Sequence, residues 1–122
     1  MTHRQLLLSQ FFVLTLLAVL FHVGLALRWY MLAPFDVLLH FLGGLWASLA
    51  LFWGSARFGY PIKSTYVFVG VMVIGAGWEV FEFIFDISGG LKDTVADFAL
   101  DATGALIGIF GVKALASKKE IV

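Results

Sequence analysis

The sequence lacks cysteine and is poor in charge, with eight basic and eight acidic residues among 122. Without cysteine the chain has no disulfide, no thiolate chemistry and no Cys-ligated metal, and its redox compartment cannot be read from cysteine usage. The formal net charge is zero and no basic run is present, which gives no reason to propose nucleic-acid binding. There is also no HExxH motif, phosphate loop or Ser/His/Asp order that would indicate a known enzyme class.

Apolar residues dominate the chain instead. They make up 61% of it, charged residues make up 13%, and the mean hydropathy is +1.00. Soluble domains contain roughly 45–50% apolar residues, and so few charged residues cannot cover a soluble surface. The composition therefore predicts an integral membrane protein, and the length predicts a single transmembrane domain over residues 1–122.

Four apolar segments are long enough to cross a bilayer as helices, which takes about 20 residues. We expect these helices at about residues 6–27, 35–53, 65–85 and 94–115. The predicted fold class is all-α, a polytopic protein with a compact bundle of four transmembrane helices. Pro34 fits the start of the second helix because it lacks the amide hydrogen that would be unpaired there. The first apolar run exceeds the 7–15 residues of a signal-peptide core, so we expect it to be a retained span.

The basic residues predict the orientation of this bundle. Four spans place both termini and the polar turn over residues 55–63 on one side of the membrane. That side carries Arg4, Arg57, Lys63, Lys113, Lys118 and Lys119, and the other side carries Arg28 and Lys92. By the positive-inside rule both termini are cytoplasmic, and the protein is expected in the inner (cytoplasmic) membrane.

Seven of the eight acidic residues lie near the opposite, extracytoplasmic side of the predicted bundle: Asp36, Glu79, Glu82, Asp86, Asp93, Asp97 and Asp101. At 1.5 Å per residue, Asp97 and Asp101 lie about 6 and 12 Å deeper than Asp93. His40 likewise lies about 6 Å below Asp36. A charged side chain in the hydrocarbon region costs at least about 2.5–3.5 kcal/mol on insertion scales, and such residues usually mark function.

In the third and fourth predicted helices the acidic residues recur at intervals of three or four, and Asp36 and His40 lie one turn apart in the second, so each of these three helices carries its polar residues on one face. Polar faces of membrane helices turn toward the bundle interior or a water-filled cavity. Gly104-x-x-x-Gly108 continues the Asp101 face and fits close helix packing, because small residues let backbones approach. We therefore predict that three spans bring together one set of side chains: His40, Glu79, Glu82, Asp97 and Asp101.

Packed carboxylates repel strongly at low dielectric, so some must be protonated, some must face water or headgroups, or a cation must lie among them. The five predicted site residues offer ligands for a divalent metal cation. Carboxylates suit magnesium, calcium or manganese, and an added imidazole allows zinc or iron. The Glu-x-x-His pattern of di-iron bundles is absent, because Glu79-Val80-Phe81-Glu82 ends in a second glutamate. The structural alternative is an interhelical hydrogen-bond network that only stabilises the fold.

Simple structural roles are expected for several other residues. Asp36 and Asp93 lie at predicted helix starts, where a carboxylate caps the helix and meets its positive dipole end. Asp86 is expected to be a solvated loop charge. His22 lies at a similar depth on the first helix, and we expect it to be a hydrogen-bonded packing residue. Trp78 and the aromatic residues that follow it are expected to contact lipid or the core.

Three ordered motifs carry a resemblance to a known family: Asp36-x3-His40-x3-Gly44, Trp78-Glu79-x2-Glu82-x3-Asp86, and Asp93-Thr94-x2-Asp97-x3-Asp101-x2-Gly104-Ala105-x2-Gly108. Over roughly residues 36–111 the chain resembles small bacterial and archaeal inner-membrane proteins of the YjdF type. More distantly it is similar to VanZ-like proteins associated with glycopeptide resistance. The resemblance implies a compact helical membrane domain in which the acidic and histidine positions matter. It implies no particular reaction, because the YjdF-type family is largely uncharacterised.

Three functions fit these observations, and the sequence leaves open whether the protein is an enzyme. In the leading interpretation, the intramembrane acidic/His site binds a divalent cation or protons and serves a lipid or envelope-linked substrate. The second is a proton or cation transporter component, although only Thr15, Ser48 and Thr65 continue a polar path through the cytoplasmic half. The third is a structural or assembly subunit of a larger membrane complex, in which His22 or His40 ligates a pigment or haem. Homo-oligomers could form through the glycine-rich faces.

Overall fold

The computed structural model describes residues 1–29, 32–85 and 90–117. This part of the chain forms four helices and no strand: α1 (His3–Ala26), α2 (Ala33–Phe58), α3 (Ser64–Ile84) and α4 (Leu91–Ser117). All four are long and apolar enough to cross a membrane. The all-α class and the four-helix bundle are confirmed, and the helices are those of a multi-pass membrane protein. Asp86, Lys118 and Lys119, which entered the sequence predictions, lie outside the described residues.

Three of the four helices, α1, α2 and α4, are longer than the apolar runs predict, and α3 has the predicted length. α1 and α4 each start three residues earlier, and α1 starts with a capping box in which the Gln5 amide donates to the Thr2 hydroxyl. α2 continues into the predicted polar turn over residues 55–63 and ends at Phe58. Its C-cap is Gly59, whose φ of +73° suits a residue without a Cβ. Pro34 lies in the first turn of α2, as predicted.

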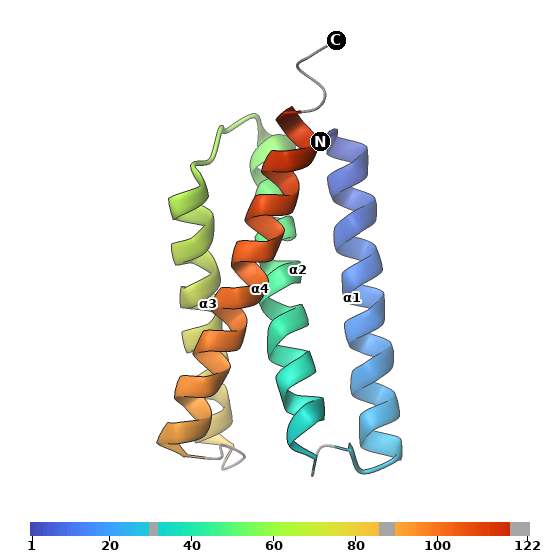
Figure 1. Ribbon diagram of the computed structural model, residues 1–122, viewed down its shortest axis with the longest axis vertical. Helices are drawn as coiled ribbons and strands as arrows, with labels where there is room; N and C mark the ends of the chain where they lie inside the picture. The colour runs from blue at the N-terminus through green and yellow to red at the C-terminus, as the bar shows by residue number, and fades with distance from the viewer. Residues whose placement is uncertain (30–31, 86–89, 118–122) are drawn as a thin grey trace.

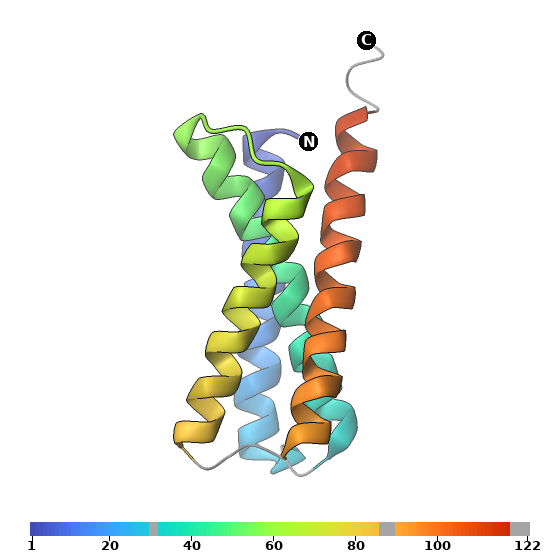
Figure 2. The same cartoon turned by 90° about the vertical axis from the view of Figure 1, so that its left-hand side faces the viewer.

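α2 is the central helix of the bundle (Figures 1 and 2). It packs against α1 on one side and against α4 and α3 on the other, and α4 also packs against α3. Among the described residues, α1 contacts no helix but α2. Two groups of buried apolar side chains form the core. Between α1 and α2 lie Leu6, Val13, Leu42 and Leu49. Where α2, α3 and α4 meet lie Ala47, Val71 and Ala105.

Glycines allow α2 and α4 to approach closely. A Cβ added at Gly104 or Gly108 would collide with atoms of α2, so the close packing predicted for these two glycines is confirmed. From the other side, a Cβ added at Gly44 would collide with the backbone of Asp101. Gly44 lies one helical turn beyond His40, so this contact holds Asp101 close to the histidine.

Replacing Gly44 with alanine is expected to lower the free energy of unfolding by about 1–3 kcal/mol, because the added methyl group forces the two backbones apart. Gly43→Ala is the matched control, because nothing lies within 4 Å of a Cβ at that position. We expect this control to stay within about 0.5 kcal/mol of the wild type. Reversible unfolding in mixed detergent micelles, followed by circular dichroism, measures both. Equal stability of the two variants would contradict the close contact.

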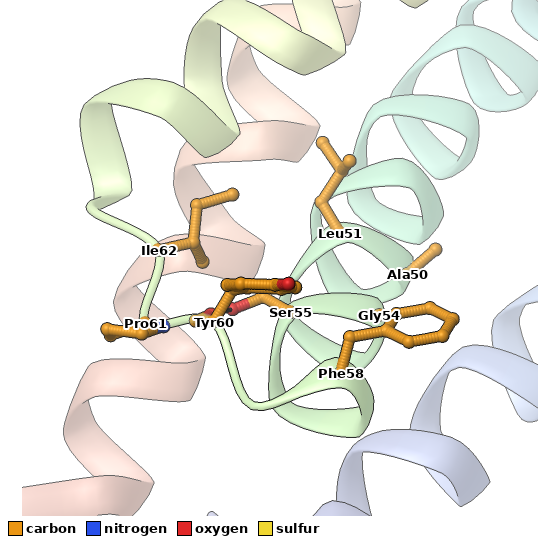
Figure 3. Close-up of a pocket in the computed structure, with 8 residues that line it drawn as sticks. All are labelled: Ala50, Leu51, Gly54, Ser55, Phe58, Tyr60, Pro61 and Ile62. Carbon is orange, nitrogen blue, oxygen red and sulfur yellow. Dashed lines mark hydrogen bonds between the residues drawn. The ribbon is translucent and has the colours of Figure 1, made fainter.

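A shallow apolar groove of about 350 Å³ lies at the end of the bundle where α2 ends and α3 begins (Figure 3). It is lined by Ala50, Leu51, Gly54, Ser55, Phe58, Tyr60, Pro61 and Ile62. The Ser55 hydroxyl donates a hydrogen bond to the carbonyl oxygen of Tyr60 and so closes the turn beside the groove. No acidic, basic or histidine side chain is among the residues that line the groove.

Candidate functional site

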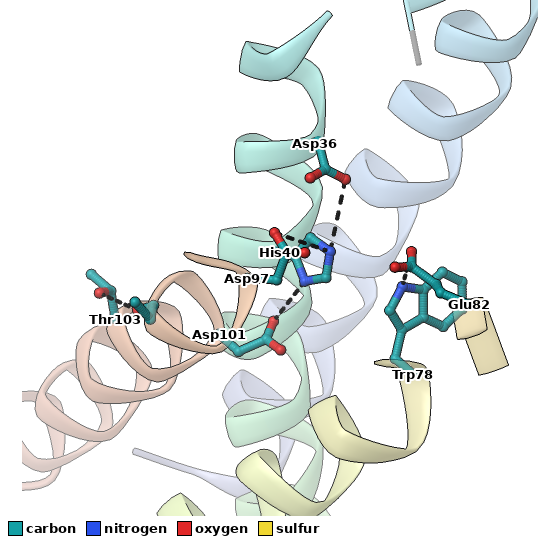
Figure 4. A network of polar contacts seen from close by, with 8 residues as sticks. Asp36, His40, Trp78, Glu82, Asp97, Asp101 and Thr103 are labelled. Carbon is teal, nitrogen blue, oxygen red and sulfur yellow. Dashed lines mark hydrogen bonds and ion pairs between the residues drawn. The ribbon is translucent and has the colours of Figure 1, made fainter. Parts of the chain in front are cut away.

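Acidic side chains and one histidine meet at the end of the bundle where α2 and α4 begin and α3 ends (Figure 4). We call this set the acidic–histidine cluster. It contains His40 and all six acidic residues that the structure describes: Asp36, Glu79, Glu82, Asp93, Asp97 and Asp101. Three helices supply it, so residues more than 50 positions apart in the sequence come together.

His40 lies at the centre of the cluster, and its side chain is 6% exposed. Its Nδ1 atom is 3.4 Å from Asp101 Oδ1. Its Nε2 atom is 3.6 Å from Asp97 Oδ1 and 3.8 Å from Asp36 Oδ1. The two ring nitrogens therefore face different carboxylates, as the dashed lines in Figure 4 show. Asp97 and Asp101 can both reach the ring because they lie one turn apart on α4.

α3 adds two glutamates to the cluster. One possible ligand atom from each of four residues lies within 4.8 Å of the others, and these residues are His40, Glu79, Glu82 and Asp97. Glu82 Oε1 also accepts a hydrogen bond of 2.8 Å from the indole nitrogen of Trp78, one turn earlier on α3. Trp78 is 46% exposed, which fits the predicted contact with lipid, and its indole nitrogen in addition orients an acid of the cluster. The i, i+4 spacing of Trp78 and Glu82 was the sequence signal for this hydrogen bond.

Glu79 is buried without a partner for one of its oxygens. The residue is 9% exposed, and its Oε1 atom has no hydrogen-bond partner among the described residues. An unpaired buried polar atom costs about 1–3 kcal/mol, and more when it is charged. Such atoms are rare in native structures and need an explanation, such as an ion or a water. Because a carboxylate oxygen of Glu79 lies within 4.8 Å of the ligand atoms of its three neighbours, the side chain is directed into the cluster.

The Asp101 carboxylate occupies a gap between α2 and α3. A Cβ added at Gly75 would lie 2.5 Å from Asp101 Oδ2, and one at Gly44 would collide with the Asp101 backbone. The absence of a side chain at both glycines is what lets the carboxylate reach His40. Gly75 was not among the predicted site residues, although it lies one turn before Glu79 on the same helix face.

A second acidic group shares Asp97 with the first. One carboxylate oxygen from each of Asp36, Asp93 and Asp97 lies within 4.8 Å of the others. Asp36 and Asp93 lie in the first turns of α2 and α4, where the helix dipole favours negative charge. The capping predicted for Asp36 was wrong, because Leu32 is the N-cap of α2 and no side chain caps that end.

His22 does not join the cluster. It is exposed on α1, and its Nδ1 atom lies 2.7 Å from the Ala18 carbonyl oxygen, to which it donates when it carries the proton. The predicted hydrogen bond is present, but the ring is not packed in a core. Similar depth in the membrane was not enough to bring His22 to the site, because α1 contacts only α2 among the described residues.

Four of the five predicted metal ligands have potential ligand atoms within 4.8 Å of one another: His40, Glu79, Glu82 and Asp97. The fifth, Asp101, contacts the far nitrogen of His40 and is not part of that group of four. Metal binding by these residues stays a prediction. Comparisons with known protein families, curated proteins and solved structures find no significant match for this chain. The resemblance to YjdF-type proteins also stays a prediction, so the function has to be argued from the cluster.

Proposed function

We propose that this protein binds a divalent metal cation in the acidic–histidine cluster and presents it to a lipid or envelope-linked substrate. The observation that carries the proposal is that Glu79, whose buried Oε1 atom has no hydrogen-bond partner among the described residues, offers a carboxylate oxygen within 4.8 Å of three other potential ligands. A cation bound there neutralises the carboxylate charge that burial makes costly.

The charge of the cluster supports a cation. Two like charges about 4 Å apart repel by about 4 kcal/mol at an effective dielectric constant of 20. His40 carries at most one positive charge, and it is surrounded by more carboxylates than it can neutralise: Asp36, Glu79, Glu82, Asp97 and Asp101. Protonation of some acids is the alternative and also relieves the repulsion, but it does not explain why four potential metal ligands lie within 4.8 Å of one another.

The spacing of the ligand atoms also suits a dication. Metal–oxygen distances of roughly 2.0–2.6 Å place opposite ligands roughly 4.0–5.2 Å apart, and the four ligand atoms here lie within 4.8 Å of one another. Three carboxylates and one imidazole form a donor set used by divalent metals in proteins. Around a six-coordinate cation, four protein ligands leave two positions for water or for a substrate oxygen.

The position of the cluster supports a substrate at the membrane surface. The Asp36 side chain is 40% exposed, Glu82 is partly exposed, and both lie at the end of the bundle. We propose that a headgroup of a lipid or an envelope-linked molecule reaches the cation from this end. A metal-bound water could then serve a hydrolytic reaction, which makes binding the first function and catalysis a second step.

The proposed orientation places this end outside the cytoplasm. The start of α1 and the end of α4 lie together at the opposite end of the bundle (Figure 1). That end has more Lys and Arg in the sequence, so the positive-inside rule supports cytoplasmic termini in the cytoplasmic membrane.

Transport of protons or a cation is the second proposal, and two buried polar residues bear on it. Gln10 and Ser48 are 8% and 0% exposed, and of the two only Ser48 was predicted to lie on a polar path. Ser48 donates its hydroxyl hydrogen to the Leu45 carbonyl oxygen, and neither residue is ionisable. These two residues do not continue the acidic path beyond Asp101, so binding is favoured over conduction. A subunit role in which His22 ligates haem is also less favoured, because His22 lies apart from the cluster.

The metal content of the purified protein tests the proposal. We expect about one equivalent of divalent metal per chain, measured by elemental mass spectrometry after purification in a mild detergent. Glu82→Gln should lower the affinity at least about tenfold, because it removes an anionic ligand and keeps the side-chain size. Thr103→Val is the control, since this exposed hydroxyl on α4 donates only to the Ala99 carbonyl oxygen. Wild-type protein that binds no divalent metal would overturn the proposal and favour protonated acids or a purely structural network.

A further inference from the structure

We infer that the cluster selects a first-row transition-metal dication, such as Mn²⁺, Fe²⁺ or Zn²⁺, over Mg²⁺ and Ca²⁺. His40 is the selective ligand through its Nε2 atom, and Asp101 is a positioning residue that orients the ring from Nδ1. This inference rests on the proposed function, because it assigns the class of cation held in the same cluster.

The two nitrogens of His40 have different surroundings. A neutral imidazole has one N–H donor and one nitrogen with a free lone pair. Asp101 Oδ1, 3.4 Å from Nδ1, is an acceptor, so it favours the tautomer with hydrogen on Nδ1. The lone pair of Nε2 is then free on the side of Asp97, whose Oδ1 atom lies 3.6 Å away. This order of carboxylate, imidazole and metal is the usual arrangement around metal-ligating histidines.

Helix packing holds Asp101 in this role. The residue is 6% exposed. Its backbone lies against Gly44, and its Oδ2 atom would be 2.5 Å from a Cβ at Gly75. With α2 and α3 both this close, the carboxylate has little freedom to turn from the ring toward the four-ligand group. Asp101 therefore acts on the site through His40 rather than as a ligand.

The donor set decides between the classes of cation. Mg²⁺ and Ca²⁺ are hard cations that take oxygen ligands, and Mg²⁺ usually keeps several waters. Imidazole suits zinc and iron, and carboxylates with imidazole also accommodate manganese. A buried imidazole with its lone pair among three carboxylates therefore favours the transition metals.

A protonated His40 paired with its carboxylates accounts for only part of the geometry. Both ring nitrogens would then be donors, which fits the contacts to Asp36, Asp97 and Asp101. It leaves the buried Glu79 Oε1 atom without a partner. A cation bound between Nε2 and Glu79 gives both groups a partner.

Metal competition on the purified full-length chain tests the selectivity. In detergent, we expect Zn²⁺ and Mn²⁺ to bind at least about 100-fold more tightly than Mg²⁺ or Ca²⁺. His40→Gln should weaken Zn²⁺ and Mn²⁺ by about 100-fold and leave Mg²⁺ within about threefold, because only the imidazole ligand is lost. His22→Gln is the matched control, since this histidine is exposed on α1 and outside the cluster.

The role of Asp101 has its own readout. With Cu²⁺ bound as a paramagnetic probe, pulsed electron paramagnetic resonance detects the far nitrogen of a coordinated imidazole, and its coupling depends on the hydrogen bond at that nitrogen. We expect wild type and His22→Gln to show this signal and Asp101→Asn to shift it. Asp101→Asn should also weaken Zn²⁺ by about 10- to 100-fold. An unshifted signal in Asp101→Asn would overturn the positioning role.

The outcomes separate the two proposals. Wild-type protein that binds none of the four cations would overturn both the proposed function and this inference. Wild-type protein that binds Mg²⁺ or Ca²⁺ as tightly as Zn²⁺ would overturn only the inference. If His40→Gln fails to fold, the wild-type affinities and the Cu²⁺ spectrum decide by themselves, and absence of imidazole coupling in that spectrum would overturn the assignment of His40 as ligand.

Discussion

Asp97→Asn is expected to abolish metal binding under conditions in which the wild type is saturated. Asp97 is 2% exposed, lies 3.6 Å from the Nε2 atom of His40, and belongs to both groups of potential ligands. Removing one partner of a buried charge pair costs about 3–5 kcal/mol, which corresponds to roughly 150- to 5,000-fold in affinity. Asparagine has the same size and shape, so the packing of α2 against α4 should survive the change.

Isothermal titration with Zn²⁺ and Mn²⁺ measures this loss, and far-ultraviolet circular dichroism checks that the variant keeps its helices. Thr103→Val controls for the removal of a polar group from α4, because its hydroxyl donates to a backbone carbonyl away from the cluster. If Asp97→Asn still held one metal per chain with unchanged affinity, the cation would be bound elsewhere.

The number of helices and the helices that supply the site could be predicted from the sequence. Long apolar runs fix the four spans. The recurrence of acids every three or four residues on α3 and α4, and the Asp36–His40 pair on α2, indicate the polar faces of these three helices. Counting residues from the helix ends gives a common depth for His40, Glu82 and Asp97. Depth and face together were enough to predict that α2, α3 and α4 meet at the cluster, because polar side chains in membrane helices face the bundle interior and pair with one another.

The absence of α1 from the site could not be predicted in the same way. His22 has the right depth, but α1 contacts only α2 among the described residues. The neighbours of a helix depend on where two backbones can approach closely, and this is set by pairs of surfaces rather than by one helix. Gly44 and Asp101 form such a pair, and neither residue alone indicates the contact.

The roles of individual atoms also depended on the three-dimensional arrangement. Asp101 and Asp97 lie on the same face of α4, and the sequence treats them alike. The packing of α2 against α4 brings Asp101 next to the Nδ1 atom of His40 and Asp97 next to its Nε2 atom. In the same way, Glu79 and Glu82 look equivalent in sequence, but Trp78 pairs with Glu82 and leaves Glu79 Oε1 unpaired.

Glu79→Leu is expected to stabilise the metal-free protein while it removes metal binding. Without metal, the wild type keeps a buried carboxylate oxygen that has no partner, and such an atom costs about 1–3 kcal/mol. Leucine has a similar volume and no polar atom, so the free energy of unfolding should rise by about that amount. A ligand at 100 times its dissociation constant stabilises the folded state by about 2.7 kcal/mol. Added Zn²⁺ should therefore stabilise the wild type and leave the variant unchanged. The difference between their free energies of unfolding should then disappear or change sign.

The same measurement distinguishes a binding site from a network that only holds the helices together. Unfolding in mixed micelles is followed for each protein with a chelator and again with excess Zn²⁺. Glu82→Leu is the matched control one turn along α3, because its carboxylate accepts the Trp78 hydrogen bond and the residue is partly exposed. This control should not stabilise the metal-free protein. A purely structural network predicts the opposite order, with Glu79→Leu less stable than the wild type in the chelator. That result would mean that the buried acid stabilises the bundle, and the unpaired oxygen would no longer indicate a cation.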